Sequence, residues 1–227
     1  HRDLHLSIRR QRQMCIRDSY KGQNINPMLQ GLQNLDKTIL LWIHNYLSNT
    51  TLDWLMPLIT EQDNWILPIL VLIFYLGFKA EKRGKITLVL LILTIILTDL
   101  ICAQILKPFI ERVRPSHLNM EGLNLLVSKG GKWSMPSNHA ANIFAFAVIL
   151  SYFYEKVKFP VFSLAFIVSF SRIYVGVHYP GDVIVGSILG YGIAWTILTL
   201  WVILKMRELK RGKTWVWYES SPPVFKY

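Results

Sequence analysis

The sequence predicts an all-α protein, a polytopic bundle of transmembrane helices, and two features of its composition support this fold class. Hydrophobic residues make up 52% of the 227 residues and charged residues 17%, which is more and less, respectively, than in an ordinary soluble domain. The apolar residues lie in long runs, and a helix that crosses a bilayer needs about 20 of them. With their flanks, the runs predict five transmembrane spans, at roughly 64–79, 86–107, 139–155, 159–176 and 181–204.

The segment before these spans, residues 20–63, has an amphipathic pattern. Between residues 35 and 47, leucine and isoleucine recur at helical spacing beside charged and polar residues, which is typical of a helix with one apolar face. This N-terminal region is either an interfacial helix or a sixth span, and the pattern favours the interfacial helix. His44 and Asp53 are then expected on a polar helix face.

The first residues differ in composition from the rest of the chain. Residues 1–19 are polar and basic, and they contain no apolar run long enough for a signal peptide. The string Met14–Ser19 looks like the translation of a transposon-end sequencing adaptor. We therefore expect residues 1–19 to be a non-native extension and the natural protein to start near Met28.

A net charge of +11 raises nucleic acid as a partner, but the basic residues lie at alternate ends of the predicted spans. They gather in the linkers 79–85 and 155–158 and in the tail 205–227, as the positive-inside rule expects of cytoplasmic segments. The loop 108–138 and the turn 177–180 then share the opposite side of the membrane. We expect membrane lipids around the core at 64–204, no nucleic acid partner and no obligate protein partner.

Three short motifs fall on that opposite side. Residues 107–115 read Lys, six residues, Arg-Pro; residues 136–139 read Pro-Ser-Asn-His; and residues 171–182 read Ser-Arg, five residues, His, three residues, Asp. Each motif alone is a weak signal. All three motifs in this order, on one side of a membrane, are very unlikely to occur by chance. Together they indicate one site.

The cations of these motifs suit a phosphate group. Lys107, Arg114 and Arg172 supply positive charge and N–H donors for phosphoryl oxygens. Seven residues of helix turn through about 700°, so Lys107 and Arg114 face the same way if the helix runs on, although a proline follows each of them. Ser137 lies where a helix N-cap is expected, so the first amides of the next helix form an anion site.

The remaining motif residues suit nucleophilic catalysis. His178, hydrogen-bonded to Asp182, is held in one tautomer with its other ring nitrogen free to attack phosphorus. His139 donates a proton to the departing alkoxide and then deprotonates the water that hydrolyses the phosphohistidine. Because lysine and arginine balance the charge of the phosphate, no metal ion or other cofactor is expected.

These motifs resemble those of the type 2 phosphatidic acid phosphatases, which share an active-site motif set with vanadium haloperoxidases and glucose-6-phosphatase. The resemblance covers about residues 60–204. In that family the second motif is usually Pro-Ser-Gly-His, whereas this chain has Asn138 in the place of the glycine. The backbone amide of Asn138 is retained for phosphate, but its side chain enters a crowded position and bears on pocket size and substrate preference.

The resemblance implies a helical core with the phosphate site at the extracytoplasmic ends of the last four helices. It assigns His178 as the nucleophile, His139 as the acid and Asp182 as the support of His178. The residues that it assigns to phosphate are Lys107, Arg114, Ser137, Arg172 and the amide of Asn138.

The expected function is hydrolysis of a phosphate or diphosphate lipid by an integral membrane protein, with the site facing the periplasm or cell exterior of a bacterial inner membrane. Undecaprenyl diphosphate is the first substrate expected; phosphatidate, phosphatidylglycerophosphate and lipid A are the others. The alternatives are a vanadate-dependent haloperoxidase and a non-catalytic lipid-binding transporter or scaffold. A binder needs the cations of the site but not its histidines and aspartate.

Other polar residues near the motifs have plainer explanations. Asp99 lies within a span, where it either pairs inside the bundle or orients Lys107. Arg112 and His117 are expected in a solvated loop. Trp133 suits a membrane interface better than contact with a substrate chain.

Overall fold

The computed structural model describes residues 27–118, 120–213 and 215–217. The predicted extension, residues 1–19, lies outside the described residues. Within the described ranges the one β pairing is an isolated bridge between Val113 and Trp133, so the predicted all-α class is confirmed. In chain order the α-helices are α2 (Pro27–Tyr46), α3 (Thr50–Thr60), α4 (Ile66–Phe74), α5 (Glu81–Asp99), α6 (Lys107–Ile110), α7 (Asn138–Phe153), α8 (Lys158–Tyr174) and α9 (Pro180–Lys210).

Short segments of other helix types join or extend these helices. Two are π-helical, η2 (Tyr75–Lys79) and η3 (Leu100–Leu106), and three are 3₁₀-helical, η1 (Asp63–Trp65), η4 (Pro115–His117) and η5 (Glu155–Val157). The chain divides into two compact units, residues 1–38 and residues 39–227. The second unit contains the helical bundle and all the motif residues.

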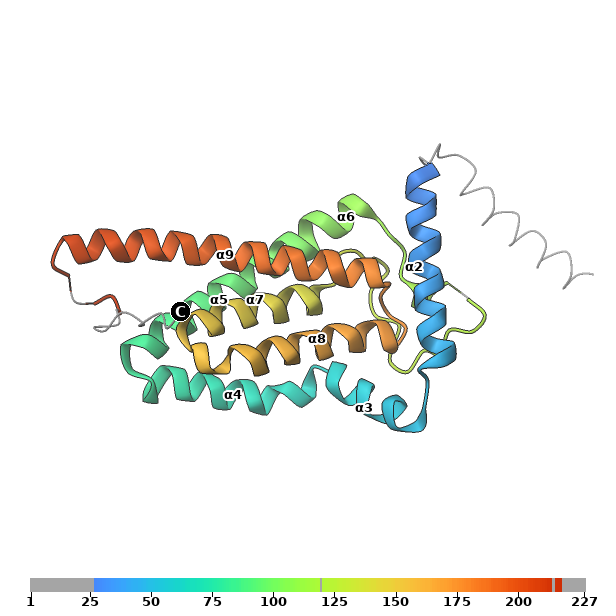
Figure 1. Cartoon of the computed structure of the whole chain (residues 1–227), viewed down its shortest axis with the longest axis horizontal. Helices are drawn as coiled ribbons and strands as arrows, with labels where there is room; N and C mark the ends of the chain where they lie inside the picture. The colour runs from blue at the N-terminus through green and yellow to red at the C-terminus, as the bar shows by residue number, and fades with distance from the viewer. Residues whose placement is uncertain (1–26, 119, 214, 218–227) are drawn as a thin grey trace, which may run out of the picture. The chain divides into compact units, whose positions relative to one another are not determined.

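Helix α7 is central to the bundle, where it contacts α5, α8 and α9. Figure 1 shows α7, α8 and α9 running side by side. At the end of the bundle away from the motifs, apolar side chains of α5, α7 and α9 form a buried core around Leu91, Ile149, Phe153 and Trp201. This packing sets the axial position of α7 against α9, and with it the relative position of the second and third motifs.

Two glycines of α9 allow its close approach to α7. A Cβ at Gly186 would lie 2.5 Å from the carbonyl oxygen of Ser137, and a Cβ at Gly190 would overlap the backbone of Ala141. The amide of Ser137 donates to the carbonyl oxygen of Asp182 at 3.0 Å. The glycine spacing in α9 therefore brings the start of α9 against the start of α7.

Among the described residues, three helical segments are long and apolar enough to cross a membrane: Glu81–Ile110, Glu155–Tyr174 and Pro180–Lys210. Helix α3 and the segment Asp63–Lys79 form a pair bent by 68°, which makes a fourth if it is one broken span. The predicted span at 139–155 is α7, whose 16 residues extend about 24 Å, less than the roughly 30 Å of a bilayer core. The chain is an integral membrane protein, and α9 continues beyond the predicted end at residue 204.

The expectation that His44 lies on a polar helix face is wrong, whereas Asp53 is half-buried. His44 is buried, with Nε2 3.3 Å from the carbonyl oxygen of Ile173, and its ring stacks on that of Tyr174. The hydroxyl of Tyr174 donates to Asp53 at 2.6 Å. These polar groups attach the end of α2 and the start of α3 to the end of α8, the helix that carries Arg172.

Candidate active site

The three motifs meet at one end of the bundle. Arg172 lies near the end of α8, His178 lies in the turn that follows, and Asp182 lies in the first turn of α9. The amide of His178 donates to the carbonyl oxygen of Arg172 at 3.2 Å, which closes that turn. His139, in the first turn of α7, has Arg172, His178, Arg114 and Lys107 as its electrostatic neighbours.

The first motif does not form a continuous helix. The π-helical turn η3 leads into Lys107 and Pro108, and a proline at that position removes a backbone donor and crowds the carbonyl four residues earlier. The helix ends at Ile110, because Glu111 adopts the left-handed conformation with φ of 51°. The expectation that Lys107 and Arg114 share one helix face does not apply, because Arg114 lies in the loop after the helix.

A turn of the loop positions Arg114 instead. Its amide donates to the carbonyl oxygen of Lys132 at 3.0 Å, and its Nε donates to that of Trp133 at 3.1 Å. Gly130, with φ of +66°, faces the guanidinium: a Cβ there would lie 2.5 Å from Nη1 of Arg114. Burial lowers the pKa of the Arg114 guanidinium, while the charge of Asp182 raises it. The residue remains a cation.

His178 and Asp182 form a buried pair. The two side chains are 1% and 0% exposed, and Nδ1 of His178 lies 3.5 Å from Oδ2 of Asp182. This distance is at the long limit of a hydrogen bond, and Nδ1 has no closer partner. The same Oδ2 accepts the amide of Tyr179 at 2.9 Å. Because Nδ1 faces the carboxylate, Nε2 is the ring nitrogen directed elsewhere.

Arg112 forms an ion pair with Asp182, so the expectation that it lies in a solvated loop is wrong. Its Nη1 lies 2.7 Å from Oδ1 of Asp182, and its side chain is only 16% exposed. The guanidinium also lies over the ring of Tyr179, 4.1 Å from the ring centre. The sequence offered no signal for this contact, because the spacing from Arg112 to Asp182 spans a loop and two helices.

Burial controls the protonation of His178. Desolvation lowers its pKa to about 4, and the positive charges of Arg114 and Arg172 act in the same direction. The hydrogen bond and negative charge of Asp182 oppose this shift. At neutral pH the imidazole is therefore neutral.

The end of α3 and the residues after it contribute two groups that sequence reasoning missed. Nη1 of the buried Arg172 donates to the hydroxyl of Thr60 at 2.7 Å, while its Nε has no partner among the described residues. The amide nitrogen of Gln62 lies 3.1 Å from Nε2 of His139. Neither Thr60 nor Gln62 belongs to a recognisable motif, so only the fold brings them to the site.

The second motif begins α7. Ser137 occupies the N-cap position with extended backbone, as expected, but its side chain makes no capping bond, and its buried hydroxyl has no hydrogen-bond partner in the described part of the chain. Asn138 directs its amide nitrogen to Oδ1 of Asp99 at 3.0 Å. Asp99 thus pairs with a residue of α7, but at the exposed surface of the bundle rather than in its interior. This contact takes up the side chain of Asn138, at the position where the family usually has glycine.

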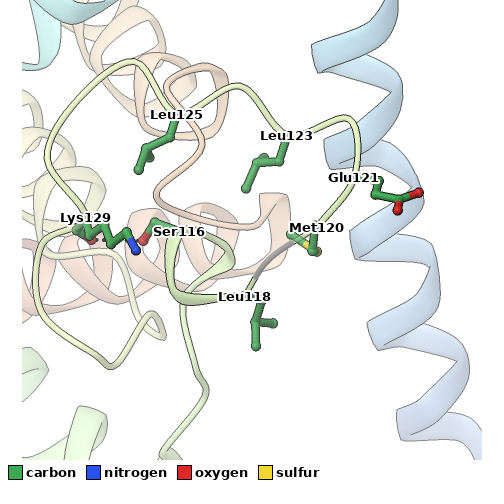
Figure 2. A pocket seen from close by; sticks show the side chains of 7 residues that line it. All are labelled: Ser116, Leu118, Met120, Glu121, Leu123, Leu125 and Lys129. Atoms are coloured by element: carbon green, nitrogen blue, oxygen red, sulfur yellow. Dashed lines mark hydrogen bonds between the residues drawn. The ribbon is translucent and has the colours of Figure 1, made fainter. Parts of the chain in front are cut away.

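The loop after the first motif lines a separate, open pocket of about 380 Å³. Figure 2 shows the side chains around it, with Leu118, Leu123 and Leu125 on its wall and Glu121 and Lys129 as its charged members. The three motifs do not line this cavity. His117 is exposed, as expected, and its ring lies 3.1 Å from the carbonyl oxygen of Gly130.

The arrangement as a whole combines two histidines, a buried carboxylate and four cations at one end of a membrane-spanning bundle. His178 is neutral, and the cations lie near the first turn of α7, an arrangement that can hold an anion beside a nucleophile. These features define an integral membrane protein whose motif end suits a phosphate group.

Comparison with known proteins agrees with this class. The profile of the PAP2 superfamily matches residues 87–206, and the chain belongs to this family, as the motifs predicted. A lipid A 4'-phosphatase of Bacteroides thetaiotaomicron is 33% identical over 172 residues, 72% of this chain and 75% of that protein. An undecaprenyl-diphosphatase of Sulfolobus acidocaldarius is 34% identical over 72% of this chain and 78% of its own length. The crystal structure of Aquifex aeolicus LpxE has a TM-score of 0.59 and 30% identity, covering 71% of this chain and 94% of that one.

Proposed function

We propose that this chain hydrolyses the phosphate ester of a membrane lipid through a phosphohistidine at His178. The chain is a lipid phosphatase, a hydrolase of the same kind as the relatives that it matches over most of its length. The observation that carries the mechanism is the buried pair of His178 and Asp182, which leaves a neutral imidazole beside a cluster of cations.

The first step transfers phosphorus to the enzyme. Nε2 of His178 attacks the phosphorus atom while the bond to the lipid oxygen breaks, and the lipid oxygen takes the electron pair of that bond. His139, whose protonated form the negative charge of the bound phosphate favours, gives this oxygen a proton, so the lipid leaves as a neutral alcohol. Phosphorylated His178 carries a positive charge, which the carboxylate of Asp182 stabilises.

The second step regenerates the enzyme. His139, now neutral, takes a proton from water, and the water oxygen attacks phosphorus as the bond to Nε2 breaks. Inorganic phosphate leaves and His178 returns to its neutral form. Throughout both steps Lys107, Arg114 and Arg172 offset the charge on the phosphoryl oxygens, with the hydroxyl of Ser137 and the amide of Asn138 as further donors.

The relatives favour a glycolipid substrate. Lipid A is the substrate named for the Bacteroides thetaiotaomicron protein, which matches this chain over nearly three quarters of both lengths. We propose lipid A or a similar phosphorylated glycolipid as the substrate. Undecaprenyl diphosphate, the substrate expected first from the sequence, is the second candidate, supported by the Sulfolobus acidocaldarius relative.

The distribution of charge supports a site on the outer face. The basic segments at 79–85, 155–158 and 205–213 lie at the end of η2, the start of α5, the turn from α7 to α8 and the end of α9, away from the motifs. By the positive-inside rule these ends are cytoplasmic. We infer that the site opens towards the periplasm of a bacterial inner membrane.

Phosphate release from purified protein tests this function. The protein in detergent with a chelator receives 4'-phosphorylated lipid A, undecaprenyl diphosphate or phosphatidate, beside His178→Ala as a blank. We expect release from at least one lipid by the wild type and none by the variant. Release from no lipid by folded protein would favour a lipid binder, and vanadate-dependent bromide oxidation in its place would identify a haloperoxidase.

A further inference from the structure

Asp99 is the one charged residue between residues 86 and 106, in the segment Glu81–Ile110 that is long and apolar enough to cross a membrane. A carboxylate in such a segment is costly to insert and is kept where it has a function. The proposed mechanism does not use it. A negative charge beside a phosphate site also weakens the binding of phosphate. The presence of Asp99 therefore needs a separate explanation.

Helix α7 holds one oxygen of Asp99 and leaves the other free. Asn138 and Asn142, one turn apart on α7, both donate to Oδ1 of Asp99 at 3.0 Å. The Asp99 side chain is exposed at the surface of the bundle. Its Oδ2 makes no hydrogen bond to any of the residues that the structure describes, so one acceptor of fixed orientation is available to a ligand.

The hydrogen bond from Asn138 places this acceptor next to the second motif. Asn138 lies directly between Ser137 and His139, the residues proposed to bind phosphate and to protonate the leaving oxygen. Lys107 follows Asp99 by eight residues, on the order of 10 Å along the helix towards the motif end. A lipid whose phosphate binds the cations extends its chains towards the membrane interior, and the group attached to the phosphate then passes Asp99.

The chemistry of a carboxylate limits what that group can be. A carboxylate accepts hydrogen bonds and donates none, and it repels a second phosphate. Hydroxyl and amide N–H groups on a sugar ring match it. The diacylglycerol of phosphatidate has no such donor, and in a polyprenyl diphosphate the neighbouring group is another phosphate.

We propose that Asp99, oriented by Asn138 and Asn142, binds a hydroxyl or amide N–H of the leaving group. It thereby selects lipids whose phosphate is attached to a hydroxylated or N-acylated sugar. This inference rests on the proposed lipid phosphatase function and names the substrate class of the same site. It also gives Asn138 a role in substrate choice through its side chain.

The substitution Asp99→Asn isolates this role. The asparagine oxygen still accepts from Asn138 and Asn142, so the link from α5 to α7 is kept, whereas the free oxygen becomes an NH₂ donor. We expect kcat/KM for 4'-phosphorylated lipid A to fall about tenfold, as one hydrogen bond to a charged group predicts, while kcat/KM for phosphatidate stays the same or rises. The matched control is Thr94→Val on the same helix, whose hydroxyl bonds only to the carbonyl oxygen of Leu90. It should leave the ratio of the two substrates unchanged.

The outcomes separate this inference from the proposed function. An equal fall on both substrates would show that Asp99 acts on the common phosphate chemistry or on folding, and would overturn the inference alone. A wild type that prefers phosphatidate, with no change in Asp99→Asn, would do the same. A folded wild type that releases phosphate from no lipid would overturn the proposed function, and this inference with it.

Discussion

Arginines lie at both ends of the bundle, buried at the motif end and half-buried at the other, in different surroundings. At the motif end, Arg172 and Arg114 donate to oxygen atoms of Thr60 and Trp133. At the other end, the guanidinium of Arg83 contacts two aromatic rings, 4.5 Å from the ring centre of Tyr154 and 4.6 Å from that of Trp217. Oxygen acceptors fix a guanidinium and leave its other N–H groups for an anion, whereas aromatic rings cover part of its surface.

The contrast indicates that the role of each arginine depends on the groups that it contacts. Arg83 packs in an apolar environment that includes Tyr154 and Trp217, so its charge is stabilised by the rings. At the motif end, a histidine pair and helix amides surround the cations. The following substitutions test whether the motif end carries the chemistry and the other end only stability.

The largest effect is expected from the nucleophile. His178→Ala removes the group that attacks phosphorus and should lower kcat by about a thousandfold or more. The matched control is His117→Ala, which removes an exposed loop histidine and should keep activity within about twofold. Phosphate release under saturating substrate measures both. Equal activity of the two variants would remove His178 from the mechanism.

Substitution by lysine should affect activity differently for the arginines at the two ends of the bundle. Arg172→Lys keeps the charge but loses the planar set of donors, so kcat/KM should fall about a hundredfold. Arg83→Lys should change kcat/KM by less than about threefold and lower the melting temperature in detergent. A large loss of activity in Arg83→Lys at unchanged stability would contradict the separation of the two ends.

The ion pair of Arg112 with Asp182 should matter for catalysis without contact to substrate. Arg112→Gln leaves the buried carboxylate without its charged partner, so the orientation of His178 suffers and kcat should fall about thirtyfold, with KM within about twofold. Arg112→Lys should recover part of the loss. The neighbouring Glu111→Gln serves as the control, since Glu111 is exposed. A rise in KM alone would indicate that Arg112 binds substrate instead.

The pH dependence should reflect burial of His178. Because its pKa is lowered to about 4, the neutral nucleophile persists down to about pH 4, and kcat/KM should fall about tenfold per pH unit below that. The unfolded value is about 6.5, so protonation favours the unfolded chain. The stability that neutral His178 contributes is present above about pH 6.5 and is lost as the pH falls through 4. A fall of kcat/KM that begins near the pKa of an exposed histidine, about 6.5, would contradict the lowered pKa of His178.

The sequence predicted the helical bundle and the family because both rest on local patterns. Long apolar runs give α5, α8 and α9, and the three motifs are read directly from residue types and spacing. The sequence did not predict the end of the helix at Ile110, because the left-handed conformation of Glu111 has no glycine or asparagine to signal it. The apolar pattern of 139–155 likewise does not show that α7 is short.

Contacts between distant segments could not be predicted in the same way. Thr60 and Gln62 reach the site because α3 is attached to α8 through Tyr174 and Asp53, and Arg112 reaches Asp182 through the loop. Arg112 was expected in solvent because charged residues in loops usually are. The identification of the motif residues as catalytic groups remains a prediction from their pattern and placement.

Trapping the phosphoenzyme tests the central claim most directly. Purified protein is mixed with a lipid carrying a radiolabelled phosphate, quenched rapidly and digested to locate the label. The proposed mechanism predicts a label that is stable in alkali and lost in acid, on the peptide containing His178, and absent from His178→Gln. Label on another residue, or phosphate release from the wild type with no labelled enzyme at any time, would contradict it.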